Sequence, residues 1–304
     1  MTNGIAPRFA AVDWGTSSFR IWLCGAKGEV IAERRSGEGM THARDNGFGN
    51  ILDAHLADMA APNDLNVVVC GMAGARQGWV EAGYIDCPAP LHHLADRATP
   101  VAHPTRDIRI LPGVAQRDPQ HPDVIRGEET QLLGLLAHDV ASVVVMPGTH
   151  SKWARMDGST LTSFSTHMTG ELFQALTSAT LLKHAVEGAT GPTDHAAFTA
   201  GVREIFETPA AWSSRLFEIR GRQLLFGASA DGAKARISGI LIGAELASGL
   251  AGASQQQPVR ILSTGGLADL YGKACDALDL PFLIEDADAA TLRGLHAAAT
   301  RIWP

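Results

Sequence analysis

The sequence predicts an α/β fold made of two duplicated lobes. This prediction rests on the length of 304 residues and on two sequence patterns that each occur twice, in the same order. A chain of this length can form two domains of about 150 residues, each large enough to bury its own core. A repeated order of strands and glycine-rich turns indicates that one α/β unit has been duplicated.

The first repeated pattern is strand, Gly-Thr turn, strand, Gly turn and strand. Apolar or alternating side chains mark each strand, and the glycines between them favour tight turns. The expected strands are residues 9–13, 19–23 and 30–34 in the first half and residues 142–146, 152–156 and 160–164 in the second. Each half therefore opens with the same three-stranded pattern.

The second repeated pattern is an apolar strand that ends in a glycine-rich turn, from which a helix is expected to start. Residues 67–70 precede GMAGARQGWVEAGY, and residues 260–262 precede STGGLADLYGKACDAL. Chance can produce one such repetition, whereas two in the same order indicate a duplicated domain.

The stretch between the halves, residues 106–127, is rich in Pro, Gly, Asp and Gln, and DPQHPD at residues 118–123 is its most linker-like part. We therefore expect an N-terminal lobe of residues 1–120 and a C-terminal lobe of residues 121–304. Apolar periodicity also predicts helices. They are expected at residues 128–138, 171–187, 194–207, 233–250 and 289–303.

Composition predicts a cytoplasmic protein that binds neither nucleic acid nor membrane. Hydrophobic residues make up 45% and charged residues 19% of the chain, and the net charge of −7 leaves no basic excess for nucleic-acid phosphates. The four cysteines are scattered, as expected of reduced thiols in the cytosol. No secretory signal is visible, and the apolar stretch 237–253 is too interrupted to span a bilayer. A homo-oligomer remains open.

An acid followed by a glycine turn with three hydroxyls lies at the end of the first expected strand. The segment consists of Asp13, Trp14, Gly15, Thr16, Ser17 and Ser18. Glycine lets the backbone approach a ligand closely, and consecutive amides and hydroxyls in a tight turn can hold phosphate oxygens. Asp13 beside them can hold Mg²⁺, directly or through water. Taken alone, the segment also fits a plain hairpin turn.

The equivalent turn of the second half offers the same chemistry with a cation added. It follows Pro147 and comprises Gly148, Thr149, His150, Ser151 and Lys152. This turn alone again fits an ordinary hairpin. Two Gly-Thr hairpins, one in each lobe, can however face each other across a cleft and grip one polyphosphate, so we interpret the pair as a phosphate clamp.

Two further segments complete the candidate site. Glu128 and Glu129 open a helix, where carboxylates usually act as caps or dipole partners. Beside a γ-phosphate, one of them can accept a proton from an attacking hydroxyl. Gly265 and Gly266 lie in a strand-to-helix turn that lets the backbone approach a purine or ribose, although a ligand-free tight turn explains the glycines equally well.

Arginines beside glycine turns are candidates for binding a substrate carboxylate through paired hydrogen bonds. The candidates are Arg20, Arg76 and Arg126, and each is alternatively a solvated surface residue. The histidine spacing predicts no metal site. The chain lacks GxxxxGK[ST], a GxGxxG after a strand, and GxSxG, which argues against P-loop enzymes, nicotinamide dehydrogenases and α/β-hydrolases.

These segments, in this order, resemble the superfamily of acetate kinase, hexokinase, actin and the heat-shock chaperone ATPases. Residues 13–18 resemble its first phosphate motif, residues 147–152 its second, and residues 263–269 its adenosine motif. Residues 285–299 resemble the helix that connects back to the hinge. The resemblance implies two actin-like, ribonuclease H-like lobes with an ATP cleft between them.

In carbohydrate kinases of this superfamily, a Gly-Asp pair opens a helix shortly before the second phosphate motif, and its Asp is the catalytic base. Gly127 and Glu128 match this position, with Glu in place of Asp. This departure leaves the base assignment between Glu128 and Glu129.

The strings VDWGTSSFR, CGMAGARQGW, LPGVAQ, IRGEETQLLG, MPGTHSKW and STGGLADLY together are similar to the 2-dehydro-3-deoxygalactonokinase family, over about residues 8–300. The resemblance implies transfer of the γ-phosphate of ATP, with Mg²⁺, to the 6-hydroxyl of 2-dehydro-3-deoxy-D-galactonate in galactonate breakdown. It implies that Asp13 acts near the metal, that both turns hold phosphates, that Gly265 and Gly266 approach the adenosine, and that Glu128 orients or deprotonates the hydroxyl.

Two alternatives stay open at this point. One is a kinase of the same fold for another sugar or sugar acid, including the gluco epimer, which differs at one hydroxyl. The other is a nucleotide-binding module without transferase activity.

Overall fold

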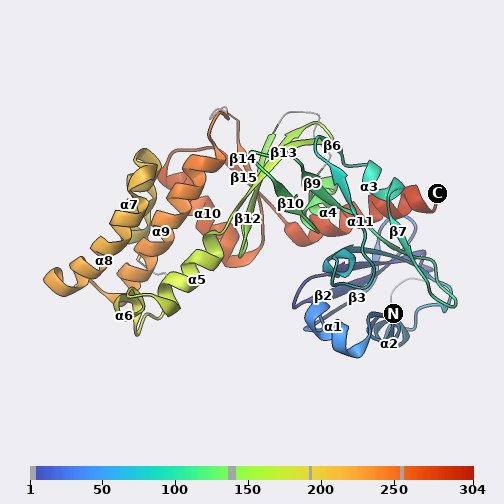
Figure 1. The fold of residues 1–304 in the computed structure, drawn as a ribbon. Coiled ribbons are helices and arrows are strands. Elements are labelled where there is room, and N and C mark those ends of the chain that lie inside the picture. The colour runs from blue at the N-terminus through green and yellow to red at the C-terminus, as the bar shows by residue number, and fades with distance from the viewer. Residues whose placement is uncertain (1–4, 136–141, 192–193, 254–256) are drawn as a thin grey trace. The chain divides into compact units, whose positions relative to one another are not determined.

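The computed structural model describes residues 5–135, 142–191, 194–253 and 257–304 (Figure 1). Contacts between Cα atoms divide the chain into two compact units. Unit 1 comprises residues 1–140, 156–163 and 287–304, and unit 2 comprises residues 141–155 and 164–286. These units are discontinuous in sequence, whereas the predicted lobes were continuous, and residue 120 falls inside unit 1.

The main sheet of unit 1 has the strand order β3-β2-β1-β4-β8-β7. Its strands are β1 (Phe9–Trp14), β2 (Phe19–Cys24), β3 (Val30–Ser36), β4 (Asn66–Gly71), β7 (Thr99–Val101) and β8 (Ile108–Ile110). Helices α1 (Met40–Asn46) and α2 (Phe48–Asp58) follow β3. The rings of Phe19 and Phe48 contact that of Trp14, with centroids 4.6 and 5.0 Å apart, so buried aromatic side chains fix α2 to the end of β1.

The remaining elements of unit 1 lead to its C-terminal helix. They are η1 (Met72–Gly74), β5 (Tyr84–Asp86), β6 (Ala89–Pro90), α3 (His93–Asp96), β9 (Gly113–Gln116), β10 (Asp123–Ile125), α4 (Glu128–Leu133) and α11 (Ala287–Ile302). α11 approaches α4 so closely that a Cβ at Gly294 would lie 1.9 Å from the carbonyl oxygen of Thr130. A Cβ at Gly134 would lie equally close, 1.9 Å, to the carbonyl oxygen of Ala290. This packing is why the end of the chain belongs to unit 1.

Unit 2 combines a sheet with a group of helices. Its elements are β11 (Ser142–Met146), β12 (Ser151–Asp157), β13 (Thr160–His167), α5 (Thr169–Ala179), α6 (Lys183–Val186), α7 (His195–Glu207), η2 (Pro209–Ala211), α8 (Trp212–Phe226), α9 (Ala230–Gly249), β14 (Val259–Leu262), α10 (Gly265–Ala277) and β15 (Phe282–Glu285). Residues 156–163, at the adjoining ends of β12 and β13, count with unit 1, as does β6, which pairs with β13.

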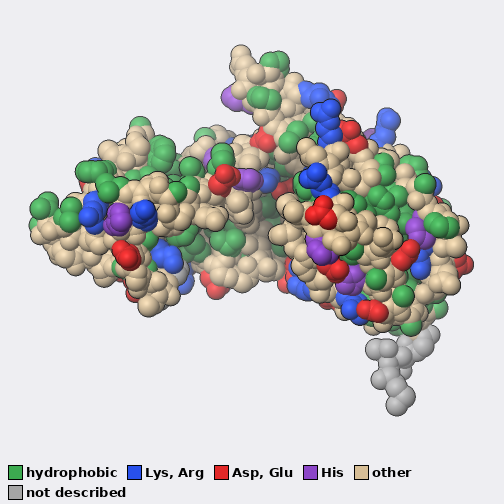
Figure 2. All heavy atoms as spheres, turned by 60° about the horizontal axis from the view of Figure 1, so that its bottom comes forward, with side chains coloured by type: hydrophobic (Ala, Val, Ile, Leu, Met, Phe, Trp, Pro, Cys, Tyr) green, Lys and Arg blue, Asp and Glu red, His purple; other side chains and the backbone are tan. Residues whose placement is uncertain are grey.

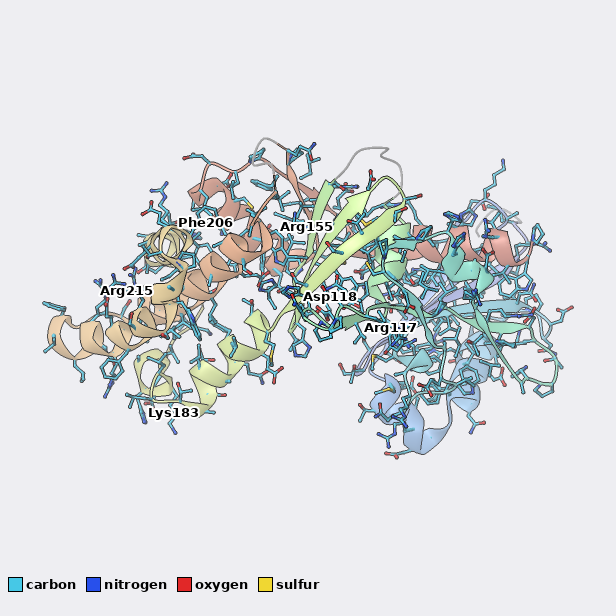
Figure 3. The ribbon with its side chains drawn as sticks, turned by 45° about the horizontal axis from the view of Figure 1, so that its top comes forward. Arg117, Asp118, Arg155, Lys183, Phe206 and Arg215 are labelled. Carbon is cyan, nitrogen blue, oxygen red and sulfur yellow. The ribbon has the colours of Figure 1, made fainter. Side chains whose placement is uncertain are left out.

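Helices α7, α8 and α9 lie side by side in unit 2 (Figure 1). Glycines on α9 permit close packing, because a Cβ at Gly239 would lie 2.2 Å from the carbonyl oxygen of Phe198 on α7. Arg215 of α8 forms an ion pair with Glu204 of α7, with Nε 2.7 Å from Oε1 (Figure 3). None of the helices among the described residues is long and apolar enough to cross a membrane.

The strand order confirms the predicted duplication. In the first half the order β3-β2-β1-β4-β8 has β1, β4 and β8 parallel, and in the second the order β13-β12-β11-β14-β15 has β11, β14 and β15 parallel. The strands predicted from the two repeated patterns are β1–β4 and β11–β14, within a few residues at each end. The same connectivity has therefore been used twice.

Three predictions about local structure are wrong. The single helix expected at residues 171–187 is divided into α5 and α6. The segment after β4 forms only the short η1 and turns instead of a helix, because Gly71, Gly74 and Gly78 all lie where a Cβ would collide with neighbouring atoms. The linker-like residues 118–123 form the hairpin loop between β9 and β10, where Figure 3 labels Asp118 and the adjacent Arg117. The helix predicted at 128–138 is observed to residue 133, and residues 136–138 lie outside the described part.

Helix α8 was not predicted. Only Leu216 and Ile219 of this helix are buried, so its sequence carries a weak amphipathic signal. Figure 2 shows hydrophobic side chains gathered at the end of unit 2 where α8 lies. The large exposed ones on α8 are Trp212, Phe217, Leu224, Leu225 and Phe226.

Candidate active site

The carboxyl ends of β1 and β4 bring the first candidate residues together in unit 1. Asp13 pairs in register with Cys70, whose Sγ donates to Asp13 Oδ1 at 3.8 Å. Gly71 follows with φ 86°, and a Cβ there would lie 2.7 Å from the carbonyl oxygen of Trp14. The glycine thus allows the backbone after β4 to turn directly against the end of β1.

Asp13 has one basic and two acidic neighbours. Burial raises the pKa of Asp13 above its usual value, the charge of Arg20 opposes this effect, and the charges of Asp288 and Glu128 add to it. Asp288 stands in the first turn of α11 and pairs with Arg20 (NH1 to Oδ1, 2.5 Å). An acidic group of this kind is one that a bound cation would stabilise.

The first Gly-Thr turn is held rigidly from outside. Within it, the amide of Gly15 donates to the carbonyl oxygen of Ser18 at 2.9 Å. The start of α1 fixes the turn, because the amides of Met40 and Thr41 donate to the carbonyl oxygens of Gly15 and Thr16 at 2.9 and 3.1 Å. The side chains of Thr16, Ser17 and Ser18 are exposed on this fixed backbone.

A glycine makes the contact between α1 and the turn possible. A Cβ at Gly39 would lie 2.5 Å from the carbonyl carbon of Ser17 and from the amide nitrogen of Ser18. No side chain at position 39 fits without moving the turn, so the sequence of α1 helps to set the geometry of the candidate phosphate site.

The structure separates the two glutamates that the sequence left as alternatives. Glu129 is fully buried, and both its carboxylate oxygens accept the amide of Gly127, at 2.9 and 2.8 Å, while Oε1 also accepts the hydroxyl of Thr130 at 3.1 Å. Burial, and then the charge of Glu128, raises the pKa of Glu129 to about 7. Glu129 therefore stabilises the turn before α4 from inside.

Glu128 lies on the accessible side of the same turn. Its side chain is half-buried, and Oε2 accepts the amide of Arg126 at 3.0 Å. Gly127 has φ 108° and lies against Gly71, where a Cβ would be 3.5 Å from the Cα of Gly71. The backbone thus brings Glu128 to the same strand ends as Asp13, whose pKa its charge raises.

The three candidate arginines have different environments. Arg126 donates from NH1 and NH2 to the carbonyl oxygens of Ala82 and Gly83, at 2.9 and 3.0 Å, and its guanidinium lies over the ring of Tyr84. Arg20 is engaged by Asp288. Arg76 is exposed and has no hydrogen bond or ion pair with the residues that the structure describes, so its guanidinium is available to an anion.

The second Gly-Thr turn, in unit 2, is fixed in the same way as the first. The amide of Glu171, at the start of α5, donates to the carbonyl oxygen of Thr149 at 3.0 Å. A Cβ at Gly170 would lie 2.5 Å from the carbonyl oxygen of Gly148. His150 is exposed, and its Nε2 lies 2.5 Å from Glu171 Oε2.

The last two residues of this segment are less accessible. Ser151 is fully buried, and its hydroxyl lies 3.0 Å from that of Tyr271. Lys152 is half-buried and contacts other residues. The side chain of Thr149 and the backbone of residues 148–150 are therefore the parts of the second turn that a ligand could meet.

The glycines of the candidate adenosine turn are open to solvent. α10 begins at Gly265, which has φ 61°, and neither Gly265 nor Gly266 has any atom within 4 Å of a Cβ position. Ser263, two residues before Gly265, is held in place by its amide, which donates to the carbonyl oxygen of Glu285 at 3.0 Å. A flat ligand could therefore lie directly on this backbone.

Among the described residues, no three His, Cys, Asp or Glu side chains form a ready-made metal site. Mg²⁺ needs no such cluster, because it usually takes one or two carboxylates together with phosphate oxygens and water. The duplicated topology is that of an actin-like fold. The acids near the end of β1 and the start of α11, and the Gly-Thr turn in each unit, are groups that a phosphotransferase can use.

Comparisons with known proteins identify the family. The model of the 2-keto-3-deoxy-galactonokinase family matches residues 13–298. A Rhizobium meliloti (strain 1021) protein called a probable 2-dehydro-3-deoxygalactonokinase is 54% identical over 97% of this chain and 98% of its own. The 2-dehydro-3-deoxygalactonokinase of Escherichia coli (strain K12) is 33% identical over 96% of this chain and 97% of its own. The chain therefore belongs to the 2-keto-3-deoxy-galactonokinase family, as its motifs predicted.

Solved structures agree with this assignment. A Sinorhizobium meliloti crystal structure that carries the same kinase name has a TM-score of 0.95 and 52% identity, and it covers 97% of this chain and 99% of that chain. The Clostridium difficile activator of 2-hydroxyisocaproyl-CoA dehydratase has a TM-score of 0.51 at 10% identity, covering 97% and 95% of the two chains, and so shares the fold alone.

Proposed function

We propose that this protein transfers the γ-phosphoryl group of ATP to the 6-hydroxyl of 2-dehydro-3-deoxy-D-galactonate, in galactonate breakdown. The observation that carries the proposal is membership, over nearly the whole chain, in a family whose relatives are named for this activity. The acids at the strand ends of unit 1 and the exposed turns of both units supply the groups that such a transfer needs.

Glu128 is the proposed catalytic base. The 6-oxygen of the sugar acid forms a bond to the γ-phosphorus, the bond from that phosphorus to the bridging oxygen of ADP breaks, and the hydroxyl proton passes to the Glu128 carboxylate. Its half-buried position beside Asp13 supports this role. Glu129 is unsuited to it, because its carboxylate is enclosed and already accepts the Gly127 amide and the Thr130 hydroxyl.

Asp13 is the proposed anchor for Mg²⁺. Its half-buried carboxylate has a raised pKa and two acidic neighbours, and an oxygen ligand of this kind suits a hard cation. When bound, Mg²⁺ would neutralise charge on the phosphate oxygens. The hydroxyls and amides of residues 16–18 and the second turn around Thr149 would hold those oxygens, and Gly265 and Gly266 would contact the adenosine.

Arg76 is the proposed partner of the substrate carboxylate. It is the one of the three candidate arginines that has no other partner among the described residues. Arg20 would act indirectly, through its pairing with Asp288 and its charge near Asp13, and Arg126 would support the turn before Glu128.

Cytoplasmic location and assembly into a homo-oligomer stay predictions from the sequence. Sedimentation of the purified protein would test the second. A kinase of the same fold for another sugar acid is the main alternative for the substrate, and an ATP-binding protein without transfer activity is the other.

A coupled ADP-release assay with ATP and Mg²⁺ tests the proposal. The acceptors would be 2-dehydro-3-deoxy-D-galactonate and its gluco epimer, each with a no-acceptor control to measure ATP hydrolysis. We expect acceptor-dependent ADP release, strongest with the galacto compound, and a product phosphorylated at oxygen 6 by phosphorus NMR. Equal turnover with the gluco epimer would overturn the stereochemical assignment, and nucleotide binding without turnover would overturn the kinase assignment.

A further inference from the structure

A buried chain of hydrogen bonds runs through the core of unit 2. Trp153 Nε1 on β12 donates to Glu245 Oε1 on α9 at 2.8 Å, and the hydroxyl of Tyr271 on α10 donates to Glu245 Oε2 at 2.8 Å. The hydroxyl of Ser151, the first residue of β12, lies 3.0 Å from that of Tyr271. Ser151, Trp153, Glu245 and Tyr271 are all at most 3% exposed.

The direction of the Ser151–Tyr271 bond follows from the bond between Tyr271 and Glu245. Tyr271 has one hydroxyl hydrogen, and where Glu245 is a carboxylate that accepts it, Ser151 is the donor to the Tyr271 oxygen. Each carboxylate oxygen of Glu245 therefore has one donor, from β12 or from α10. Ser151 thus donates to Tyr271, Tyr271 donates to Glu245, and Trp153 donates separately to Glu245.

A buried carboxylate is costly unless its hydrogen bonds are well made, so the surrounding elements are held to one arrangement. The neighbourhood is otherwise apolar, since Trp153 and Tyr271 belong to one cluster with Val145, Phe198 and Ile261. The indole of Trp153 also lies against α9 at Gly249, where a Cβ would be 2.1 Å from the ring. Packing and hydrogen bonds thus fix β12 to α9 together.

A second contact from β12 strengthens the same attachment. Arg155 NH2 donates to the carbonyl oxygens of Gly249 and Ala251, at 3.2 and 2.7 Å, at the end of α9 (Figure 3). β12 is therefore anchored to α9 at Trp153 and Arg155, while Ser151 ties its first residue to α10.

This chain of hydrogen bonds connects the two segments to which we have assigned nucleotide contacts. Ser151 directly follows the second Gly-Thr turn, and Tyr271 lies on α10, less than two turns after Gly265 and Gly266. We propose that Glu245 and Tyr271 are positioning residues of the nucleotide site, which hold the phosphate turn and the adenosine turn of unit 2 at the spacing that one ATP molecule requires. This inference rests on the proposed function, because it takes both turns as ATP contacts.

The hydroxyl of Ser151 has a revised role in this arrangement. It faces Tyr271 inside the core, so it positions the turn and does not reach a phosphate itself. A phosphate near this turn would be met by the backbone of residues 148–150 and by Thr149.

Binding of Mg-ADP by isothermal titration calorimetry, on the full-length protein, tests the proposal directly. We expect Tyr271→Phe, which removes both hydroxyl bonds but keeps the ring, to raise the dissociation constant of Mg-ADP about tenfold. Glu245→Gln should act in the same direction, and Ser151→Ala more weakly. In steady-state kinetics the KM for ATP should rise, while the KM for the sugar acid stays unchanged.

Phe198→Leu is the matched control. Phe198 lies in the same core cluster and is 3% exposed, but it has no part in the hydrogen-bond chain. This variant should lower the melting temperature at least as much as Tyr271→Phe and leave Mg-ADP binding unchanged. Equal weakening of Mg-ADP binding by Phe198→Leu, or unchanged binding in Tyr271→Phe, would overturn the positioning role.

The same measurements separate this inference from the proposed function. A wild-type protein that binds Mg-ADP but phosphorylates no sugar acid would remove the proposed activity, and the dissociation constants would still test the chain. A wild-type protein that phosphorylates the sugar acid while Tyr271→Phe binds Mg-ADP normally would remove this inference alone. A wild-type protein that binds no Mg-ADP would remove both.

Discussion

The two Gly-Thr turns share a backbone design but differ in the side chains behind them. In each unit a glycine at the N-terminal end of a following helix touches the turn: Gly39, the residue before α1, in unit 1, and Gly170, the second residue of α5, in unit 2. In each unit the next amide, of Met40 or Glu171, donates to a carbonyl oxygen of the turn. Duplication has therefore preserved how the turns are held.

The groups at the ends of the central strands have diverged. In unit 1 the half-buried position at the end of β1 carries Asp13, close enough to Glu128 and Asp288 for their charges to raise its pKa. In unit 2 the corresponding strand β11 ends in Met146, and the buried acid of that unit, Glu245, is hydrogen-bonded to Trp153 and Tyr271. Under the proposed function, this comparison leads us to expect acid–base and metal chemistry in unit 1 and nucleotide positioning in unit 2.

The largest effect is expected from the acids of unit 1. Glu128→Gln should lower kcat about 10³-fold, because general-base catalysis typically contributes 10²–10⁴-fold, and Asp13→Asn should have an effect of similar size. Thr149→Ala in unit 2 should instead raise the KM for ATP a few-fold with little change in kcat. Steady-state kinetics of the three variants, with melting temperatures as the folding control, checks this division. Full turnover by Glu128→Gln would contradict this division of roles between the two units.

The strands could be predicted from the sequence because alternation and glycine turns are local signals. Helix α2 also has a readable pattern, since its buried residues include Phe48, Ile51, Leu52 and Leu56 at helical spacing, and it was overlooked. Helix α8 buries only Leu216 and Ile219, so its sequence offers little to read. Domain membership of residues 287–304 depends on packing of α11 against α4, which no local pattern reveals.

The candidate site was predictable by residue type but not by orientation. Glu128 and Glu129 are neighbours on one helix turn, and only burial distinguishes them. Arg126 donates to backbone carbonyl oxygens, which every residue has. Its structural role could therefore not be predicted from the residue types in the sequence. Asp288 was not included in the predicted site, because the acids near it in space lie far away in sequence. Its position in the first turn of the last helix was the one signal that could have indicated it.

The second prediction tests whether both turns depend on their glycine contact. Gly39→Ala and Gly170→Ala each place a Cβ 2.5 Å from backbone atoms of a turn. Because displacement of about 1 Å near a reacting group can cost about 10²-fold, we expect losses of that order in kcat/KM for ATP. Gly37→Ala and Gly221→Ala are matched controls, since nothing lies within 4 Å of a Cβ at either position. A loss confined to one turn would show that the two are not equivalent.

The third prediction concerns the buried carboxyl that supports unit 1. The pKa of Glu129 in the folded protein is about 7, above the usual 4.5, so the folded protein binds the proton more tightly than the unfolded chain. The resulting stabilisation is fully present below pH 4.5 and is lost as the pH rises through 7. Glu129→Gln imitates the protonated group at every pH. Relative to wild type, its free energy of unfolding should therefore rise by about 2–3 kcal/mol from pH 5 to pH 8.

Urea unfolding at both pH values measures this difference. Glu128→Gln removes a charge that raises the pKa of Glu129, so this variant should show a weaker pH dependence than the wild type. A difference between Glu129→Gln and wild type that is constant from pH 5 to pH 8 would mean that Glu129 is ionised throughout. The Gly127 amide would then dominate over burial in setting its charge.

The smallest effect is expected at Arg76, and it tests whether unit 1 also binds the acceptor. Arg76 is exposed and free of partners among the described residues, so removing its guanidinium leaves no buried group unsatisfied and should not change stability. Arg76→Ala should raise the KM for the sugar acid about tenfold, the loss expected for one charge-assisted hydrogen bond, and leave the KM for ATP unchanged. Arg117→Ala removes a similarly exposed cation of unit 1, paired with Asp86 on the surface, and should change neither constant. If the KM for ATP rises in Arg76→Ala instead, this arginine serves the nucleotide, and the division of roles between the two units fails at that residue.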